Sequence, residues 1–269
     1  MLILKCSSKL THNGLVKMMA AVPIKLKQYC LFIILTTLCL SSEITADTLE
    51  LSTLEWPPFS GSELPEQGIN SQIISKALSF ENHTLTIAVL PWNRAARSVT
   101  TGQTIGYYPT YYNPANGLLF SDPIGASPIV LIERKNNPII WDKVSDLNQY
   151  ELGVLKGYIN TVEVDEMIAN GSQKFETGID EKQNILKLAA GRIDTIIMDV
   201  NVYQYLKSDP QVAKVTHLLQ VNPKVLQDKT LHITFNNNQE GKKWCDIINQ
   251  GLAKLDVNAM QNTVLPPTK

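Results

Sequence analysis

Short runs of apolar, often β-branched residues alternate with helical patterns along the chain from residue 47 onward. In the helical segments apolar residues recur three and four positions apart, as at Ile69, Ile73, Ile74 and Leu78. The apolar runs predict strands over residues 49–54, 85–90, 104–109, 129–133, 152–155, 193–199 and 231–235. The helical pattern predicts helices over residues 69–80, 93–101, 161–169, 181–190, 201–207 and 241–255. This alternation is typical of an α/β protein whose sheet is flanked by helices.

One helix-to-strand turn occurs twice, over residues 102–106 and 191–195. Each begins with a glycine, which can take the left-handed conformation that ends a helix. The strand that follows runs to residues 107–109 in one case and 198–199 in the other. Because ligands of open α/β sheets gather at the carboxyl ends of strands, these two ends are expected to face one cleft. The repeat favours two lobes over a single sheet, and coincidence of a common turn is the alternative.

The first 46 residues have the character of a targeting segment. Lys25 and Lys27 stand before residues 29–40, an uncharged apolar run that a polar stretch follows. This order predicts a secretory signal peptide cleaved after Ala46, because the run is shorter than the ~20 residues of a membrane span. Translation from Met18 or Met19 is an alternative start. A retained anchor and a lipoprotein at Cys39 are the rival interpretations, and the bulky Leu38 before that cysteine disfavours the second.

Composition and charge narrow the function classes. The 269 residues are 44% hydrophobic and 18% charged, which is typical of a globular chain with one large or two medium domains. The first 46 residues hold five of the 24 basic residues and one of the 25 acidic ones, which leaves a net charge of −5 on the remainder. No concentrated basic face is evident, so a nucleic-acid binder is disfavoured.

The remaining chain holds few residues for redox, metal or nucleophilic chemistry. Cys245 is its one cysteine, which excludes an internal disulfide, and the apolar spacing around it predicts a buried helix residue. His83, His217 and His232 are scattered without the spacing of metal ligands. No serine-hydrolase elbow, zinc-protease motif or nucleotide-binding glycine motif occurs. We therefore expect neither a metal nor a cofactor, and no enzyme activity.

Seven short segments follow one another in the order of a known family: Trp56-Pro57-Pro58-Phe59, Gly68, Pro91-Trp92-Asn93-Arg94-Ala95, Gly102, Phe120-Ser121-Asp122-Pro123, Leu147 with Gly153-Val154-Leu155-Lys156-Gly157, and Gly191-Arg192-Ile193-Asp194. In their order and spacing, residues 49–264 resemble the extracytoplasmic solute-binding proteins of the polar amino-acid type, which capture ligand for ATP-binding-cassette (ABC) importers. The resemblance implies a two-lobed periplasmic-binding-protein (Venus-flytrap) fold of the α/β class with two hinge strands. Lobe 1 would comprise residues 47–127 and 230–269, and lobe 2, inserted between them, residues 128–229.

The resemblance also implies which residues contact the ligand. Trp56 follows the first strand, where the family places an aromatic residue on the ligand; a core or lid tryptophan is the alternative. Asp199 ends a lobe 2 strand, where the family places the carboxylate that pairs with a ligand ammonium; a helix N-cap is the alternative. Trp92 and Arg94, at a strand-to-helix turn, would project into the cleft or brace the helix.

A second lobe 2 turn adds further candidates for ligand contact. Gly157, Tyr158 and Asn160 open a helix, where free backbone N–H groups can receive an anionic oxygen; an ordinary turn and cap is the alternative. Four tyrosines between residues 107 and 112 predict an aromatic-lined pocket, to which Tyr108 and Tyr111 are the expected contributors, while some of the four must serve packing.

Two departures from the family pattern concern the ligand's carboxylate. The family's arginine, about six residues before the FSDP-like segment, is absent: residues 112–117 contain no basic side chain. Ile105 replaces the aspartate of the first-lobe Gly-x-x-Asp pattern. Either Arg94 substitutes for the missing arginine or the ligand is not a standard α-amino acid.

The function expected from the resemblance is periplasmic capture of a small polar solute, an amino acid or related amine, by a monomer that delivers it to an ABC permease. A sensor that presents the bound solute to a membrane receptor is the alternative from another class. A cleft enzyme of the same fold, such as a dehydratase using Asp199, Asp194 or Glu55, is the third hypothesis.

Overall fold

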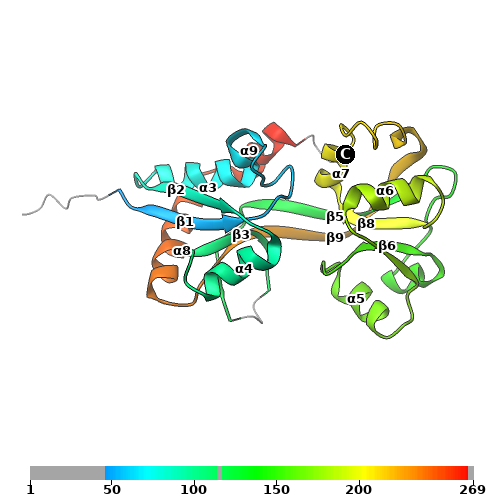
Figure 1. The fold of residues 1–269 in the computed structure, drawn as a ribbon, viewed down its shortest axis with the longest axis horizontal. Coiled ribbons are helices and arrows are strands. Elements are labelled where there is room, and N and C mark those ends of the chain that lie inside the picture. Colours follow the sequence, from blue (N-terminus) through cyan, green and yellow to red (C-terminus); the bar gives the residue numbers. More distant parts are fainter. Residues whose placement is uncertain (1–45, 114–116, 266–269) are drawn as a thin grey trace, which may run out of the picture. The chain divides into compact units, whose positions relative to one another are not determined.

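Two long antiparallel strands connect the two halves of the fold in the computed structural model, which describes residues 46–113 and 117–265. These strands are β5 (Gly125–Arg134) and β9 (Leu219–Phe235), and they pair with each other over much of their length. Nine strands of the described residues form one mixed sheet in the order β2-β1-β3-β9-β5-β8-β6-β7, with β4 paired to β9. Figure 1 shows β5 and β9 running between two groups of elements, which we name lobe 1 and lobe 2.

Lobe 1 is built on a parallel core in which β1 lies between β2 and β3, and the carboxyl end of β9 is antiparallel to β3. Helices α3 and α8 pack against each other, and α4 lies against β1 and β3. The elements of lobe 1 besides the two long strands are β1 (Thr48–Thr53), η1 (Pro65–Gln67), α3 (Ile69–Ser79), β2 (Thr84–Val89), α4 (Trp92–Thr100), β3 (Gly106–Tyr111), β4 (Leu119–Phe120), α8 (Gln239–Leu252) and α9 (Val257–Val264).

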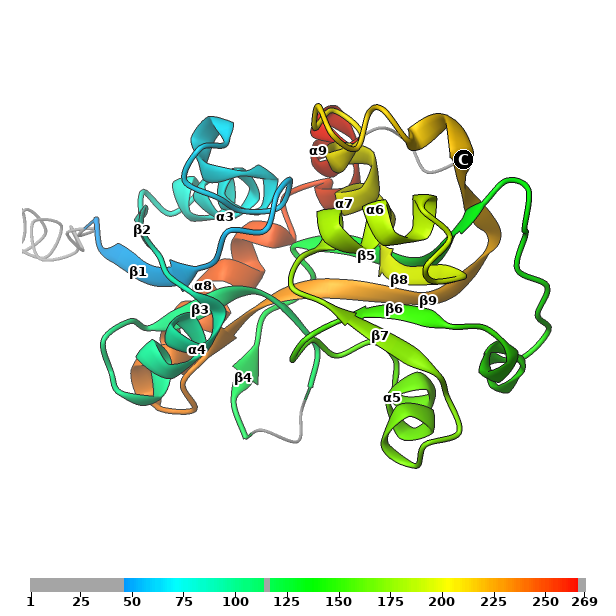
Figure 2. The same ribbon diagram turned by 45° about the vertical axis from the view of Figure 1, so that its right-hand side comes forward.

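Lobe 2 repeats this plan, with β8 antiparallel to β5 and parallel to β6, and β7 at the edge of the sheet. Figure 2 shows α6 and α7 on one side of these strands and α5 on the other. The elements of lobe 2 are η3 (Val144–Gln149), β6 (Leu152–Leu155), α5 (Val162–Ala169), β7 (Phe175–Gly178), α6 (Glu181–Ala189), β8 (Thr195–Asp199), α7 (Val200–Leu206) and η4 (Thr216–Leu218).

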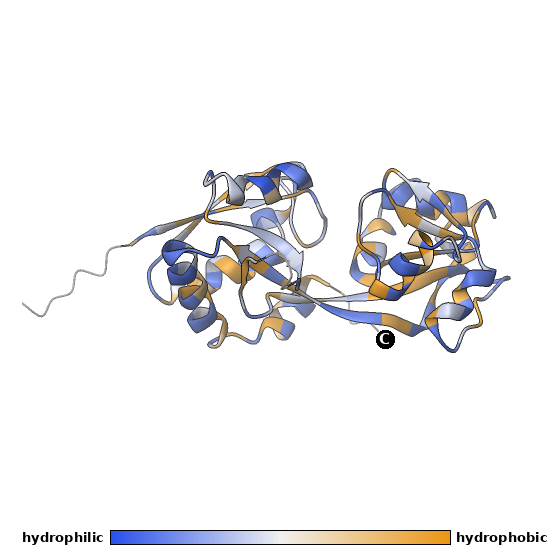
Figure 3. Ribbon diagram, turned by 90° about the horizontal axis from the view of Figure 1, so that it is seen from below, coloured by the Kyte–Doolittle hydropathy of each residue, from blue (hydrophilic) through white to orange (hydrophobic). Residues whose placement is uncertain are grey.

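The alternation of β5 explains why the sheet of lobe 2 is covered on both faces. Successive side chains of a strand point to opposite faces. Val130 and Ile132 accordingly join the large core cluster that contains α6 and α7 residues, whereas Ile129 and Leu131 join a second cluster beneath α5. Figure 3 shows hydrophobic residues concentrated in the elements of each lobe and hydrophilic ones where the two long strands pass between the lobes.

Both predicted helix-stop glycines have the left-handed conformation. Gly102 follows α4 with a φ of 71°, and Gly191 follows α6 with a φ of 73°. Strand β3 runs to Tyr111, two residues beyond the end predicted at residues 107–109, and Tyr111 lines one pocket together with Asp199, the carboxyl end of β8. The sequence prediction of two strand ends facing one cleft is thus confirmed.

The structure corrects the extent of several predicted elements. The sequence predicted β9 only over residues 231–235, but the strand begins at Leu219. Pro223 and the polar Gln227, Asp228 and Lys229 break its hydrophobic alternation, because this segment crosses between the lobes with much of its surface exposed. The sequence analysis missed three elements that lack a clear hydrophobic pattern. These are the short, largely exposed strand β7, the two-residue strand β4 and helix α9.

The structure bears in part on the expectations for Cys245, the N-terminal segment and the lobe boundaries. Cys245 is a free, buried residue of α8, as predicted. Among the described residues no helix is both long enough and apolar enough to span a membrane. The predicted signal peptide falls on residues 1–46, of which 1–45 lie outside the described residues. The predicted lobe boundaries, near residues 127 and 230, fall within β5 and β9 where the two strands pair, and their exact positions remain a prediction.

Candidate functional site

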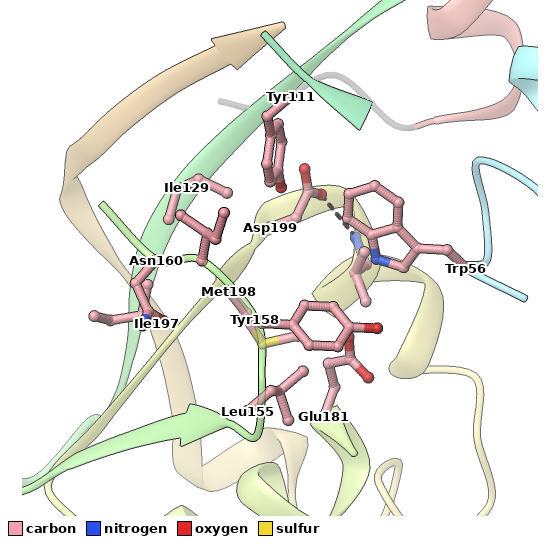
Figure 4. A pocket seen from close by; sticks show the side chains of 12 residues that line it. Trp56, Tyr111, Ile129, Leu155, Tyr158, Asn160, Glu181, Ile197, Met198 and Asp199 are labelled. Carbon is pink, nitrogen blue, oxygen red and sulfur yellow. Dashed lines mark hydrogen bonds between the residues drawn. The ribbon is translucent and has the colours of Figure 1, made fainter. Parts of the chain in front are cut away.

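Two adjoining pockets lie where lobe 1, lobe 2 and the two long strands meet. The first, which we name the acidic pocket, has a volume of about 50 Å³ and contains the side chains of Asp199 and Glu181 (Figure 4). The second, which we name the aromatic pocket, has a volume of about 540 Å³, within the ~300–1,000 Å³ usual for small-molecule sites. The pockets share four lining residues: Trp56, Tyr111, Tyr158 and Ile159.

Trp56 forms part of the wall that lobe 1 contributes to both pockets. It follows β1 and forms an isolated bridge with Ser60, which fixes the turn that carries the ring. Its indole packs against Phe59 at 5.1 Å and meets Tyr111 edge-on at 5.9 Å between ring centroids. The Trp56 side chain is therefore half-buried: it packs against the hydrophobic core and also lines the pocket.

Asp199 ends β8 and begins α7, and both of its carboxylate oxygens accept hydrogen bonds. Oδ1 accepts from the backbone N–H of Asn201 at 2.6 Å and of Val202 at 3.0 Å, so Asp199 is the N-cap that the sequence offered as an alternative. Oδ2 accepts from Ser127 Oγ of β5. Burial raises the pKa of Asp199 to about 6, against the opposing effect of these hydrogen bonds. The nearby carboxylate of Glu181 adds to the rise in this pKa.

Glu181 is a pocket carboxylate that the sequence analysis missed. It is the first residue of α6, directly after the N-cap Asp180, and its half-buried side chain faces the acidic pocket with Tyr158 (Figure 4). Burial raises the pKa of Glu181, and the neighbouring Asp180 raises it further. Neither Glu181 nor Asp199 has a Lys, Arg or His nitrogen within 4.0 Å among the described residues. A cap followed by an acidic residue predicts only a helix start, so the sequence carried no signal for this role.

Tyr111 connects the lobe 1 wall to the carboxylate of lobe 2. Its hydroxyl lies 3.1 Å from Ser127 Oγ, which in turn donates to ionised Asp199. Because a serine hydroxyl carries a single proton, Tyr111 must then be the donor to Ser127. Burial raises the pKa of Tyr111, so the phenol stays protonated and keeps this donor role.

Lys229 of β9 is a second residue that the sequence analysis missed, and it lines the aromatic pocket. Its Nζ lies 4.2 Å from the centroid of the Tyr111 ring and donates to the carbonyl oxygen of Asn160. Burial lowers the pKa of Lys229, while the charge of Asp165 opposes that change. The polar stretch that surrounds Lys229 in the sequence gave no indication that a strand places it at the pocket.

Residues 157–160 line the pockets, so their contact with a ligand stays a prediction, and their polar groups are partly engaged by the protein itself. Gly157 and the 46% exposed Tyr158 line the aromatic pocket, and Asn160 lines the acidic one. The backbone N–H of Asn160 donates to Asp165 Oδ2 at 3.1 Å, and its side-chain amide donates to Oδ1 at 2.7 Å. A carboxylate of the protein therefore already occupies one N–H group that could have received an anionic ligand.

Two of the other predicted contacts, Trp92 and Tyr108, occupy different environments. Trp92, at the start of α4, lines the aromatic pocket and packs edge-on against Tyr107. Tyr108 is fully buried in the core, where its hydroxyl lies 2.8 Å from Ser71 Oγ, so it lines neither pocket. Tyr108 is thus one of the tyrosines that serve packing.

Arg94 is exposed on α4 and lines neither pocket. The segment in which the family's arginine is missing falls partly on residues 114–116, outside the described residues. The structure therefore gives no support to Arg94 as a carboxylate clamp.

The residues considered for catalysis are not gathered at the site. Glu55 accepts hydrogen bonds from Ser62, and Asp194 pairs with Arg134 at 3.3 Å; neither lines either pocket. Asp199 alone of the three faces the cleft. Within the described residues no group of three or more His, Cys, Asp or Glu side chains is placed to hold a metal ion.

Comparisons with known proteins address the fold. No family model matches the sequence, and no curated protein sequence matches it either. Among solved structures, arginine-bound ArgBP from T. maritima, as a single-residue variant, is 17% identical with a TM-score of 0.60, over 78% of this chain and 96% of that one. The probable amino-acid ABC transporter extracellular-binding protein ytmK from Bacillus subtilis is 14% identical with a TM-score of 0.67, over 81% and 97%.

A third structure has a different biological role. A histidine kinase sensor domain with similarity to periplasmic binding proteins is 13% identical with a TM-score of 0.66, over 81% of this chain and 96% of that one. At these identities the likeness concerns the fold. The predicted resemblance to extracytoplasmic solute-binding proteins is thus confirmed in three dimensions: this chain has their two-lobed α/β fold, with two strands joining the lobes.

Proposed function

We propose that this protein captures a small polar solute with a cationic group, an amino acid or a related amine, by closing its two lobes, and delivers it to an ABC importer outside the cytoplasm. The observation that carries the proposal is the pair of carboxylates, Asp199 and Glu181, in an aromatic-walled pocket without a basic partner within 4.0 Å among the described residues.

The electrostatics of the acidic pocket favour a cation. Burial raises the pKa values of both Asp199 and Glu181, which means that each carboxylate pays a desolvation cost when it is ionised. A ligand ammonium or guanidinium offsets that cost by charge-assisted hydrogen bonds. The aromatic rings of Trp56 and Tyr158 add apolar area to the wall, and a cation over either ring would gain about 0.5–2 kcal/mol of cation–π attraction.

Lobe closure is supported by the fact that both lobes contribute residues to the pocket lining. Trp56 and Tyr111 belong to lobe 1, whereas Tyr158, Glu181 and Asp199 belong to lobe 2. A ligand that contacts both sets stabilises the closed arrangement by whatever free energy it gains across the two lobes. The hinge function assigned to β5 and β9 accords with this, since these strands link the lobes.

Calorimetric titration with L-arginine, agmatine and succinate tests the proposal. We expect the two cationic compounds to bind and succinate not to bind. Asp199→Asn should weaken L-arginine binding by about tenfold to 150-fold, since charged hydrogen bonds contribute ~1.5–3 kcal/mol. Asp194→Asn, which removes an equal charge outside the pockets, should leave the affinity unchanged. Binding of succinate alone would refute the proposal.

A product assay addresses catalysis separately. L-arginine recovered after prolonged incubation with the protein should be chemically unchanged, because both pocket carboxylates, Asp199 and Glu181, bind the ligand's cationic group in this proposal. Conversion of the bound compound would favour the cleft-enzyme hypothesis.

Sensing is a second candidate function, favoured by the similarity to a histidine kinase sensor domain. Capture and closure serve transport and sensing equally, so the membrane partner decides between them. Crosslinking of the ligand-loaded protein in intact cells should recover an ABC permease for transport and a receptor for sensing.

A further inference from the structure

Lys229 is the basic side chain of the site. Of the residues that line the acidic and aromatic pockets, it alone is a lysine, arginine or histidine. The half-buried side chain reaches the aromatic pocket from the strand that joins the lobes. A cation at this position is relevant because the arginine with which related proteins hold a ligand carboxylate is missing from residues 112–117.

The ammonium group of Lys229 retains capacity to bind an anion. Its Nζ donates to the Asn160 carbonyl oxygen and lies over the ring of Tyr111. An ammonium carries three N–H donors, and no second acceptor contacts it among the described residues. It also lies more than 4.0 Å from every carboxylate oxygen of those residues, so it forms no direct ion pair there, although the charge of Asp165 acts on it.

The register of the two long strands relates Lys229 to Asp199. Lys229 is directly opposite Ser127 in the β5–β9 ladder. Ser127 donates to Asp199 and receives the Tyr111 hydroxyl, whose ring lies beneath the Lys229 ammonium. The cation thus lies over the ring of Tyr111, the carboxylate is linked to its hydroxyl through Ser127, and the two charges do not form an ion pair with each other.

We propose that Lys229 is a specificity-determining residue whose ammonium holds the carboxylate of a zwitterionic ligand, while Asp199 and Glu181 hold the ligand's cationic group. This inference rests on the proposed function and narrows it, because it selects amino acids over the corresponding amines. The two charged subsites, one at the ring of Tyr111 and one linked to its hydroxyl, provide complementary contacts to a molecule that carries both charges.

Calorimetric titration with L-arginine and its decarboxylated form, agmatine, tests the role of Lys229. The wild-type protein should prefer L-arginine by about tenfold or more, as expected for a charge-assisted hydrogen bond. Lys229→Gln, which keeps a donor for the Asn160 carbonyl but removes the charge, should abolish the preference by weakening L-arginine binding alone. Lys229→Arg should restore most of the preference.

Lys224 provides a matched control on the same strand. Its Nζ lies 4.2 Å from the Trp141 ring and donates to the Asp142 carbonyl, but it lines neither pocket. Lys224→Gln should therefore keep the preference for L-arginine. If the preference arose only from long-range electrostatics, the loss of this charge on the same strand would weaken it as well. Thermal denaturation of each variant verifies folding, and Lys229→Met is the second neutral variant should the glutamine variant fail to fold.

Each outcome separates the inference from the proposed function. A wild-type protein that binds both compounds equally, or a Lys229→Gln variant that still prefers L-arginine, would overturn the role of Lys229 and leave solute capture intact. A wild-type protein that binds neither compound would overturn this inference through the proposed function on which it rests, a result distinct from loss of the preference alone. Loss of the preference in both Lys229→Gln and Lys224→Gln would also overturn the specific role.

Discussion

Replacing Asp199 with asparagine should make the protein more stable at neutral pH while it weakens binding. The side chain is 4% exposed and caps α7 through Oδ1, which receives both backbone N–H groups. An asparagine carbonyl can accept the same two bonds, and the two residues rank equally as N-caps. The substitution removes the buried charge and replaces the acceptor that faces Ser127 with an amide donor, to which the Ser127 oxygen can serve as acceptor.

The magnitude follows from the pKa of Asp199. Burial raises it from 3.8 to about 6, so the folded state binds the proton more tightly than the unfolded state does. The stability contribution of this group is therefore fully present below pH 3.8 and is lost as the pH rises through 6. A difference of about 2 in pKa corresponds to about 3 kcal/mol. Asp199→Asn should avoid this loss.

Urea denaturation at pH 4 and pH 7.5 measures the effect. The variant and the wild type should be nearly equal in free energy of unfolding at pH 4, and the variant should gain up to about 3 kcal/mol at pH 7.5. Asp209→Asn is a control of opposite sign, because the ion pair with Lys182 lowers the pKa of Asp209, so its loss should destabilise at pH 7.5. An Asp199→Asn variant less stable than wild type at pH 7.5 would refute the reasoning.

Three further predictions concern binding and packing. The affinity for L-arginine should fall about tenfold between pH 7.5 and pH 5 as Asp199 takes up a proton, and calorimetry should find a flatter profile in Asp199→Asn. Arg94→Lys should change that affinity less than about twofold, because Arg94 lines neither pocket and a charged hydrogen bond would contribute more; a larger loss would return it to the site. Gly251→Ala should destabilise by about 1–3 kcal/mol in urea denaturation, since its Cβ would lie 2.3 Å from the Ala77 carbonyl oxygen; unchanged stability would contradict this close approach of α8 and α3.

The sequence determined the local architecture because local rules govern it. Apolar spacing located α3 and α8, and the glycines at 102 and 191 located the ends of α4 and α6, since only a few residue types tolerate a positive φ. The order of short family-like segments then indicated the two-lobed fold. These signals act within a few residues of each other, so a single chain suffices to detect them.

The sequence also determined which residues had the chemistry for a site, but only as alternatives. Asp199 was either a ligand carboxylate or a helix cap, and the structure shows that it caps α7 while its carboxylate also lines the acidic pocket. Tyr108 and Tyr111 lie in one tyrosine-rich segment, and the sequence offers no reason to prefer one over the other as a pocket residue. Tyr108 lies in the core and Tyr111 at the pocket, because the register of β3 against its neighbours decides the facing of each side chain.

Only the tertiary structure decided which distant residues share the pocket. Glu181 lies at a helix start and Lys229 in a polar stretch of strand, and neither segment has a sequence signal for a binding site. Arg94, whose charge suits a carboxylate, lies exposed on α4 and lines neither pocket. The position of Lys229, for example, follows from the pairing of β5 with β9, which sets Ser127 opposite Lys229 across about a hundred residues of chain. Such long-range register is fixed by the packing of both lobes, and no pattern within one segment contains it.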